Sequence, residues 1–198
     1  MNESKSIGDG NDPRTDEQVM AAFARGSTDA FNVLFSRYKQ PLFGFFCRRI
    51  TDRGHAEELA QETFLAVLRA QGRYEATALF RTYLYAVAFR ILKTHRRKAA
   101  FRAIFSASAP EHFEPAAQSG MEHGLALRDA VGRLDRIDRE ILLLREFEEL
   151  TYAEIAAVLD IPVNTVRSRL FRARTALREL LTSPAGEAGN LSRAEEHA

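Results

Sequence analysis

The sequence is poor in the residues that form covalent cross-links and metal centres. Its single cysteine, Cys47, excludes an internal disulfide framework. Because Cys47 stands among apolar residues at helical spacing, we interpret it as a small core residue rather than a redox or metal-binding thiol. The five histidines are scattered, and none has a histidine four residues away or a cysteine nearby. No metal site is expected.

Catalytic motifs are also absent. The chain contains neither a phosphate-binding P-loop nor a Gly-x-Ser-x-Gly nucleophile elbow, and its serines lie mainly in segments predicted as tails and linker. The acidic side chains follow helix faces and do not form a converging pair. We therefore predict no catalytic residue and no cofactor, and an enzyme is not expected.

Long hydrophobic runs are missing as well. No apolar run approaches the length of a membrane span, and no signal peptide opens the chain, so we expect no membrane insertion and a cytoplasmic location. With 198 residues, of which 45% are hydrophobic, the chain can bury one or two modest cores.

Neither sign of charge is in excess, because the formal net charge is only +1. The charges are instead segregated along the chain. Residues 90–102 contain arginine, lysine and histidine but no acid, whereas acids concentrate in residues 57–62 and 135–149. This segregation predicts that phosphate-binding and protein-binding surfaces lie on different elements.

The most informative stretch, residues 150–181, is predicted to form two helices with a tight turn between them. Thr151 and Glu154 have the spacing of a capping box at the start of the first helix. Pro162 ends this helical pattern and falls near the first turn of the second helix. The arrangement is typical of a helix-turn-helix, which binds DNA through its second helix.

The second helix of this pair has one apolar face that must meet a core, made of Val166, Leu170, Ala173, Leu177 and Leu180. No acid occurs between Pro162 and Arg178. Arginine can bond phosphate or guanine, amides and hydroxyls reach base edges, and an aromatic ring can contact a thymine methyl. We therefore predict base contacts by Asn164, Thr165, Arg167, Ser168, Phe171 and Arg172, and phosphate contacts by Arg169 and Arg174. The alternative is a solvated basic face on a structural helix.

Residues 161–174, IPVNTVRSRLFRAR, resemble the promoter-reading helix of bacterial extracytoplasmic-function (ECF) sigma factors. The family usually has Gly where Asn164 stands. The resemblance implies that this helix docks on the −35 element of a promoter. It also implies an all-α fold of two small helical domains joined by a flexible linker.

The domain organisation follows from this resemblance and from composition. Residues 15–98 are expected to form sigma region 2, which binds core polymerase and recognises and melts the −10 element, and residues 125–182 the region 4 helix-turn-helix. The remaining segments lack helical periodicity or are rich in Ala, Ser, Pro and Gly. They are predicted to be a disordered tail (1–14), a linker (99–124) with a short helical piece around residues 101–105, and a flexible tail (183–198).

Apolar periodicity predicts four helices in the N-terminal part. The first begins near Thr15 and ends at Gly26, and the second starts at residues 27–29 and is bent or broken by Pro41. The third covers residues 56–70 and the fourth residues 79–98.

The third helix carries acidic and amide side chains on its outer face, and alone it would be an ordinary solvated amphipathic helix. Its segment 55–64, HAEELAQETF, is similar to the part of sigma region 2 that grips the clamp helices of the RNA polymerase β′ subunit. The resemblance implies Glu58, Gln61 and Glu62 as core-polymerase contacts. It further implies the polymerase β flap, promoter DNA and an anti-sigma factor as partners.

In the fourth helix aromatic residues alternate with cations, as melted DNA requires for base stacking and charge neutralisation. The alternative is a buried aromatic face with a solvated basic tail. Residues 80–88, FRTYLYAVA, resemble the sigma segment that captures the −10 element. This implies DNA contacts by Phe80, Arg81, Tyr83, Tyr85, Arg90, Lys93 and Arg97. The chain departs from the family at three places. The family commonly has Trp where Tyr83 stands, Arg-Asn where Phe89-Arg90 stand, and Asp where Thr94 stands.

The sequence therefore predicts an ECF-type sigma factor that acts by binding alone. One alternative is a stand-alone helix-turn-helix regulator, which would bind a palindrome as a dimer without polymerase. Another is an adaptor that binds only protein, which would leave the absence of acids between Pro162 and Arg178 unexplained.

Overall fold

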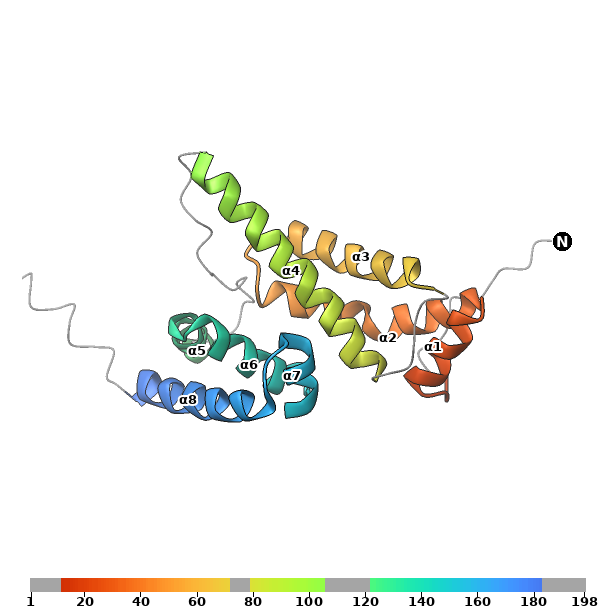
Figure 1. The fold of residues 1–198 in the computed structure, drawn as a ribbon. Helices are drawn as coiled ribbons and strands as arrows, with labels where there is room; N and C mark the ends of the chain where they lie inside the picture. The colour runs from red at the N-terminus through yellow and green to blue at the C-terminus, as the bar shows by residue number, and fades with distance from the viewer. Residues whose placement is uncertain (1–11, 72–78, 106–121, 183–198) are drawn as a thin grey trace, which may run out of the picture.

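The computed structural model describes residues 12–71, 79–105 and 122–182. Within them the chain forms helices and no strand, which confirms the predicted all-α class (Figure 1). None of these helices is both long enough and apolar enough to cross a lipid bilayer. The helices are α1 (Asp16–Ala24), α2 (Thr28–Cys47), α3 (Arg53–Arg69), α4 (Phe80–Phe105), α5 (Glu122–Arg133), α6 (Arg136–Glu146), α7 (Tyr152–Leu159) and α8 (Val163–Thr182).

Side-chain caps set the starts of the first three helices. Thr15, Ser27 and Asp52 each accept a hydrogen bond from the backbone N–H three residues further on. The predicted starts near Thr15 and Ser27 are confirmed. α3 begins at Arg53 rather than at the predicted residue 56, because Asp52 is available as its cap.

α2 continues through Pro41, where the sequence predicted a bend or a break. Proline removes one backbone hydrogen bond and its ring crowds the preceding turn, which costs about 3 kcal/mol in a helix interior. The flanking turns bury Leu34, Leu42, Phe45 and Phe46 almost completely. Each of these side chains gains roughly 1.5–3 kcal/mol on burial, so packing outweighs the proline penalty.

Aromatic side chains fill the centre of the N-terminal half, as the helical spacing of α2 predicted. Phe23, Phe45, Phe46 and Phe80 are almost fully buried. The rings of Phe80 and Tyr38 lie 5.4 Å apart in a T-shaped arrangement. One core therefore joins α1, α2 and α4.

Two predicted boundaries differ from the structure. α4 runs to Phe105 instead of ending at residue 98, because no Gly or Pro interrupts residues 99–105. The short helical piece expected around residues 101–105 is therefore the last part of α4. The end of the predicted N-terminal tail is held in place, since Arg37 donates hydrogen bonds to the carbonyl oxygens of Asp12 and Arg14. The remaining predictions on the tails, on the linker and on the loop after α3 lie outside the described residues.

The two helices and tight turn predicted near the C-terminus are confirmed as α7 and α8. Thr151 and Glu154 form the predicted capping box of α7. Asp160 ends this helix in the left-handed region, with φ of 56°. Pro162 directly precedes α8, and its carbonyl oxygen accepts the first hydrogen bonds of that helix. Asp135 likewise caps the start of α6, where its side chain accepts hydrogen bonds from the backbone N–H groups of Ile137 and Asp138.

The two halves of the chain pack against each other, with α4 beside α7 (Figure 1). Buried apolar side chains from both halves belong to one cluster. Glu154 lies in this contact. Its Oε1 accepts hydrogen bonds from Arg81 Nη2 at 3.0 Å and from the Thr82 hydroxyl at 2.9 Å. Its Oε2 accepts the Thr151 backbone N–H at 2.8 Å. The same carboxylate therefore caps α7 and ties it to α4.

These hydrogen bonds set the pKa of Glu154. Burial acts to raise the pKa, but the bonds from Thr151, Arg81 and Thr82 lower it from 4.5 to about 2. Because the folded pKa lies below the unfolded pKa, the ionised carboxylate stabilises the fold above pH 4.5. This contribution is lost as the pH falls toward 2.

We expect Glu154→Gln to flatten the acid limb of the stability curve. Glutamine keeps the capping box, since Glu and Gln both serve at this position, but it cannot ionise. Between about pH 5 and pH 3 the free energy of unfolding should fall more steeply for the wild type than for Glu154→Gln, as measured by urea unfolding. Asp129→Asn, in an exposed pair with Arg133, is the control and should leave the stability curve of the wild type unchanged. Identical curves for the wild type and Glu154→Gln would contradict the assignment.

Candidate nucleic-acid and protein interfaces

α8 separates a buried face from an exposed one. Val166, Leu170 and Ala173 are buried, and Leu177 and Leu180 pack against the same core, as predicted. Thr165 is half-buried at the edge of this face. The other predicted base-contacting side chains are all exposed: Asn164, Arg167, Ser168, Phe171 and Arg172. The predicted faces are therefore confirmed, whereas contact with DNA stays a prediction.

Phe171 stands out on the exposed face of α8. Its side chain is 72% exposed, whereas the neighbouring Leu170 is 1% exposed. An aromatic ring left in water forgoes roughly 1.5–3 kcal/mol of burial. The residues one helical turn away on the same face are polar or cationic, so the ring adds little apolar burial to the fold: Arg167, Ser168, Arg174 and Thr175. An exposed ring beside guanidinium groups suits contact with a thymine methyl.

The two predicted phosphate contacts are paired with acids of α6. Arg169 Nη1 lies 2.9 Å from Asp138 and 3.3 Å from Asp135, at the start of that helix. Arg174 Nη2 lies 2.7 Å from Glu146, its last residue. The Arg174 pair is about half-exposed, so exchanging the carboxylate for a phosphate costs little. Arg169 is more deeply placed and also ties α8 to α6.

The predicted acidic face of α3 is exposed, and it includes Glu58, Gln61 and Glu62. Two leucines on the same helix, Leu65 and Leu68, are 48% and 36% exposed. The sequence analysis did not predict these leucines as surface residues. The signal was that neither falls on the apolar face of this helix that points to the core. Exposed apolar side chains beside charged ones are typical of a protein-binding surface.

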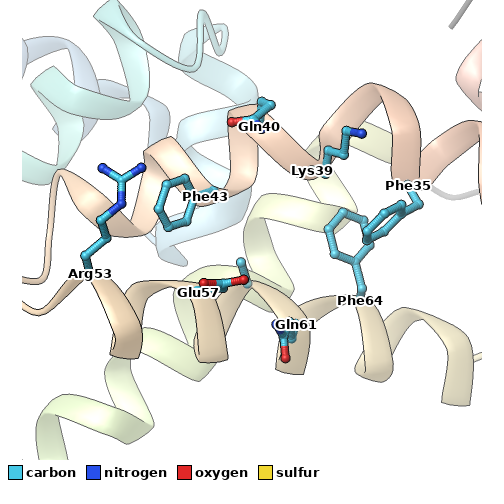
Figure 2. A pocket seen from close by; sticks show the side chains of 9 residues that line it. Phe35, Lys39, Gln40, Phe43, Arg53, Glu57, Gln61 and Phe64 are labelled. Atoms are coloured by element: carbon cyan, nitrogen blue, oxygen red, sulfur yellow. The ribbon is translucent and has the colours of Figure 1, made fainter.

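A groove of about 380 Å³ lies beside this face, between α2 and α3 (Figure 2). The rings of Phe35 and Phe64 meet in it at a centroid distance of 4.8 Å, and Phe35 is 41% exposed. Of the three predicted core-polymerase contacts on α3, only Gln61 lines the groove. Its full lining is Phe35, Lys39, Gln40, Phe43, Arg53, Glu57, Ala60, Gln61 and Phe64. An aromatic floor with a mixed-charge rim suits a protein segment.

Three of the predicted −10 contacts form an exposed basic face on α4. Arg90, Lys93 and Arg97 are exposed, and their spacing of three and four residues places them on one side of the helix. Arg81 and Tyr83, nearer the start of the helix, are half-buried. The exposed cations can neutralise phosphates in the conformation described.

The remaining two predicted −10 contacts are core residues in this conformation. Phe80 is fully buried, and Tyr85 is 3% exposed with its ring 5.5 Å from that of Phe45. Burial raises the pKa of Tyr85 to about 12, and the nearby Glu148 adds to this effect. For these two aromatics the structure matches the alternative that the sequence left open, a buried aromatic face.

A hollow at the end of α4 was not predicted. It has a volume of about 530 Å³ and is lined by Arg97, Lys98, Phe101 and Arg102. Phe101 is 64% exposed. The signal in the sequence was an aromatic residue among cations, but it lay in the segment predicted as linker. Cations around an exposed ring suit a nucleic-acid strand.

No metal centre is evident in the part of the chain that the structure describes. His55 and His95, distant in sequence, have ring centroids 5.7 Å apart, and His55 Nδ1 lies 3.6 Å from the Asp52 carboxylate. Among the described residues, however, no group of three or more His, Cys, Asp or Glu side chains could hold a metal ion. Cys47 packs against the core, and burial raises the pKa of its thiol, as expected for a structural cysteine.

Comparison with known proteins identifies the family. The family models for Sigma-70 region 2 and Sigma-70 region 4 match residues 34–102 and 124–177. The RNA polymerase sigma-H factor of Pseudomonas aeruginosa is 33% identical over 180 residues, which cover 84% of this chain and 93% of that protein. The ECF RNA polymerase sigma-E factor of Escherichia coli K12 is 33% identical over 177 residues, 82% of this chain and 92% of that protein. The chain belongs to the ECF sigma factors.

Solved structures match the fold of this sigma factor. CnrH, in complex with the cytosolic domain of CnrY, matches with a TM-score of 0.66 and 23% identity over 86% of this chain and 99% of that chain. RpoE of Bartonella quintana, in complex with the anti-sigma factor NepR, matches with a TM-score of 0.63 and 22% identity over 76% of this chain and 98% of that chain. The resemblance inferred from the recognition helix is confirmed.

The contrast between Leu170 and Phe171 gives a matched test of the two faces of α8. Leu170→Ala should lower the free energy of unfolding by about 2–5 kcal/mol, because it leaves a cavity in the core. Phe171→Ala should change it by less than about 0.5 kcal/mol, because the ring is already in water. Thermal or urea unfolding of both variants checks this. A Phe171→Ala variant destabilised as much as Leu170→Ala would show that the ring packs against the fold.

Proposed function

We propose that this sigma factor binds core RNA polymerase and directs it to promoters through two helices, with α8 on the −35 element and α4 on the −10 element. The observation that carries the proposal is the exposed face of α8, free of acids from Val163 to Arg178, in a chain whose N-terminal and C-terminal halves match sigma-70 regions 2 and 4. The protein would act by binding energy alone, with contacts to bases and polymerase offsetting the cost of unstacking.

The exposed face of α8 supports the assignment of −35 recognition. Asn164, Ser168 and Arg172 present an amide, a hydroxyl and a guanidinium to solvent, and Phe171 adds an apolar contact. These groups match the donors and acceptors of base edges in the major groove. Thr165 and Arg167 complete the proposed base contacts. The positions of Arg169 and Arg174 on the flanks suit phosphates.

The assignment of −10 recognition to α4 rests first on the exposed Arg90, Lys93 and Arg97. These side chains can track the backbone of a melted strand. Arg81, Phe80, Tyr83 and Tyr85 stay candidates for base contact only if α4 is uncovered or rearranged.

We assign core-polymerase binding to α3 and the adjoining groove. Glu58, Gln61 and Glu62 would face a basic partner surface, and the groove beside Gln61 would receive an apolar side chain of the β′ clamp helices. The β flap is a further expected partner, with no residue of this chain assigned to it. Since promoters and polymerase share the bacterial cytoplasm, we place the protein's action there.

A stand-alone helix-turn-helix regulator is not favoured. Such a protein would not need a second half that matches sigma-70 region 2 or an exposed acidic face on α3. An anti-sigma factor stays an expected partner. The matched RpoE of Bartonella quintana is held by one, and we extend that expectation to this chain.

In-vitro transcription tests the proposal. Purified core polymerase and this protein, combined on a library of genomic promoter fragments, should give transcripts that neither component gives alone. Gel shifts with and without core separate the alternatives. Retarded promoter DNA only in the presence of core supports the sigma factor, whereas a symmetric footprint by the protein alone supports the stand-alone regulator.

Arg172→Ala and Arg174→Ala should differ in specificity. Arg172→Ala should lose roughly 1–3 kcal/mol on the matched −35 element and much less on scrambled DNA, because it removes a base contact. Arg174→Ala should weaken matched and scrambled sites alike and reduce the salt dependence by about one phosphate contact. Fluorescence anisotropy with the holoenzyme measures both. Equal losses on the two DNAs for Arg172→Ala would remove its assignment.

Glu62→Lys should weaken the complex with core polymerase. The change places a cation on the exposed acidic face of α3, where it would repel a basic partner surface, and we expect a loss of at least about tenfold in affinity at low salt. Glu179→Lys, an equally exposed charge reversal on α8, is the matched control and should bind core normally. Native gel or mass photometry measures binding. Equal behaviour of the two variants would move the core contact elsewhere.

A further inference from the structure

The last turns of α4 present an aromatic ring and a group of cations to solvent. We call this surface the α4-end hollow. It has a volume of about 530 Å³, and its described lining is Arg97, Lys98, Phe101 and Arg102. All four side chains are exposed, and in Figure 1 the end of α4 projects beyond the other labelled helices. A partner can therefore reach the hollow from solvent.

Phe101 is the unusual member of this group. Its side chain is 64% exposed, whereas Phe80 and Leu92 of the same helix are fully buried. The exposed ring adds little to the stability of the fold, because most of its surface remains in water. An exposed aromatic ring among cations offers a flat surface on which a nucleic-acid base can stack.

The cations beside the ring can neutralise an added anion. Arg97 and Lys98 form no ion pair with any carboxylate in the part of the chain that the structure describes, whereas the adjacent Arg96 is bonded to Glu140 at 2.7 Å. The sequence contains no acid at all in residues 76–110. A bound phosphate would therefore pair with Arg97 and Lys98 without breaking an ion pair of the described residues.

The hollow continues the exposed basic face of α4. Arg90, Lys93, Arg97 and Phe101 follow one another at intervals of three and four residues, which places them on one side of the helix. At 1.5 Å per residue, Arg90 and Phe101 lie about 16 Å apart along the helix axis. This distance is roughly that of a few nucleotides, each of which spans about 3.4 Å or more. A strand that follows these cations would reach the ring.

The chemistry of the lining matches a nucleotide better than a protein segment. A base has a flat face for the ring, and its phosphates carry the charge that the cations require. Phe101 is the only apolar side chain among the described lining residues, and a protein interface has a larger apolar centre.

We propose that the α4-end hollow binds a nucleotide unit, with the base stacked on Phe101 and the adjoining phosphates paired with Arg97, Lys98 and Arg102. The neighbouring basic face favours a single strand as the source of this nucleotide. The assignment goes beyond the −10 contacts proposed above, in which Lys98, Phe101 and Arg102 have no role. Only the identity of the strand, promoter DNA, rests on the proposed function.

Fluorescence anisotropy of the full-length chain without polymerase tests the stacking. The probe is a labelled oligonucleotide of about eight thymidines at low salt. Phe101→Ala should weaken binding at least about fivefold, because it removes one base–aromatic stack, and Phe101→Tyr should restore it. Phe147→Ala removes a ring that is 58% exposed directly after α6, and as the matched control it should leave binding unchanged. Equal binding by the wild type and Phe101→Ala would overturn the proposal.

Two further ligands identify the source of the nucleotide. Thymidine triphosphate supplies a base and phosphates without a strand, and a hairpin duplex supplies a strand without unpaired bases. A loss for Phe101→Ala on the oligonucleotide alone supports a single strand, whereas an equal loss on the triphosphate supports a free nucleotide. Equal losses on the oligonucleotide and the duplex would overturn the stacking, because a paired base cannot lie on the ring.

The salt dependence of oligonucleotide binding tests the phosphate contacts. Lys98→Ala with Arg102→Ala should reduce the slope of log affinity against log salt by about 1.4, because each phosphate contact on a single strand contributes about 0.7. Arg25→Ala with Arg69→Ala, which removes two exposed cations far from the hollow in sequence, should leave the slope unchanged. Identical slopes for the two double variants would overturn the assignment of these cations.

These measurements are independent of the test of the proposed function. Failure of the chain to form a complex with core polymerase would overturn the proposed function, and binding of the oligonucleotide to the chain alone would still decide the role of the hollow.

Discussion

The burial of Arg49 is the constraint on which the arrangement of the two halves depends. A guanidinium stays charged in a protein, so it can be buried only where carboxylates neutralise it. Glu140 and Glu148 supply that charge, and both lie in the C-terminal half. The N-terminal half therefore does not by itself neutralise the guanidinium in the turn that follows α2. Either the C-terminal helices cover it or Arg49 must turn to water.

Several arginines that we propose as DNA contacts form ion pairs with carboxylates in this structure. On α4 Arg81 is bonded to Glu154, and on α8 Arg169 and Arg174 are bonded to acids of α6. Carboxylate and phosphate make the same bidentate demand on a guanidinium. The acids of the C-terminal half thus occupy, in the free chain, groups that a nucleic-acid backbone would neutralise.

Local sequence determined the helices and the faces of α8. Capping residues such as Thr15, Asp135 and Thr151 act on backbone groups within three residues, so their effect can be read without knowing the fold. The apolar spacing of Val166 and Leu170 likewise predicts which side of α8 is buried and which is left for DNA. The resemblance of the recognition helix to ECF sigma factors rests on the same local pattern.

Tertiary structure alone decided what covers α4 and what lies beside α3. Burial of Phe80 and Tyr85, pairing of Arg49 with Glu140, and the groove next to Gln61 all join segments far apart in sequence. The spacing of arginines along a helix is the same whether their guanidinium groups contact phosphate, water or a carboxylate. Charge and spacing therefore predict that a side chain can bind an anion. Only the packing of the two halves determines which anion it binds.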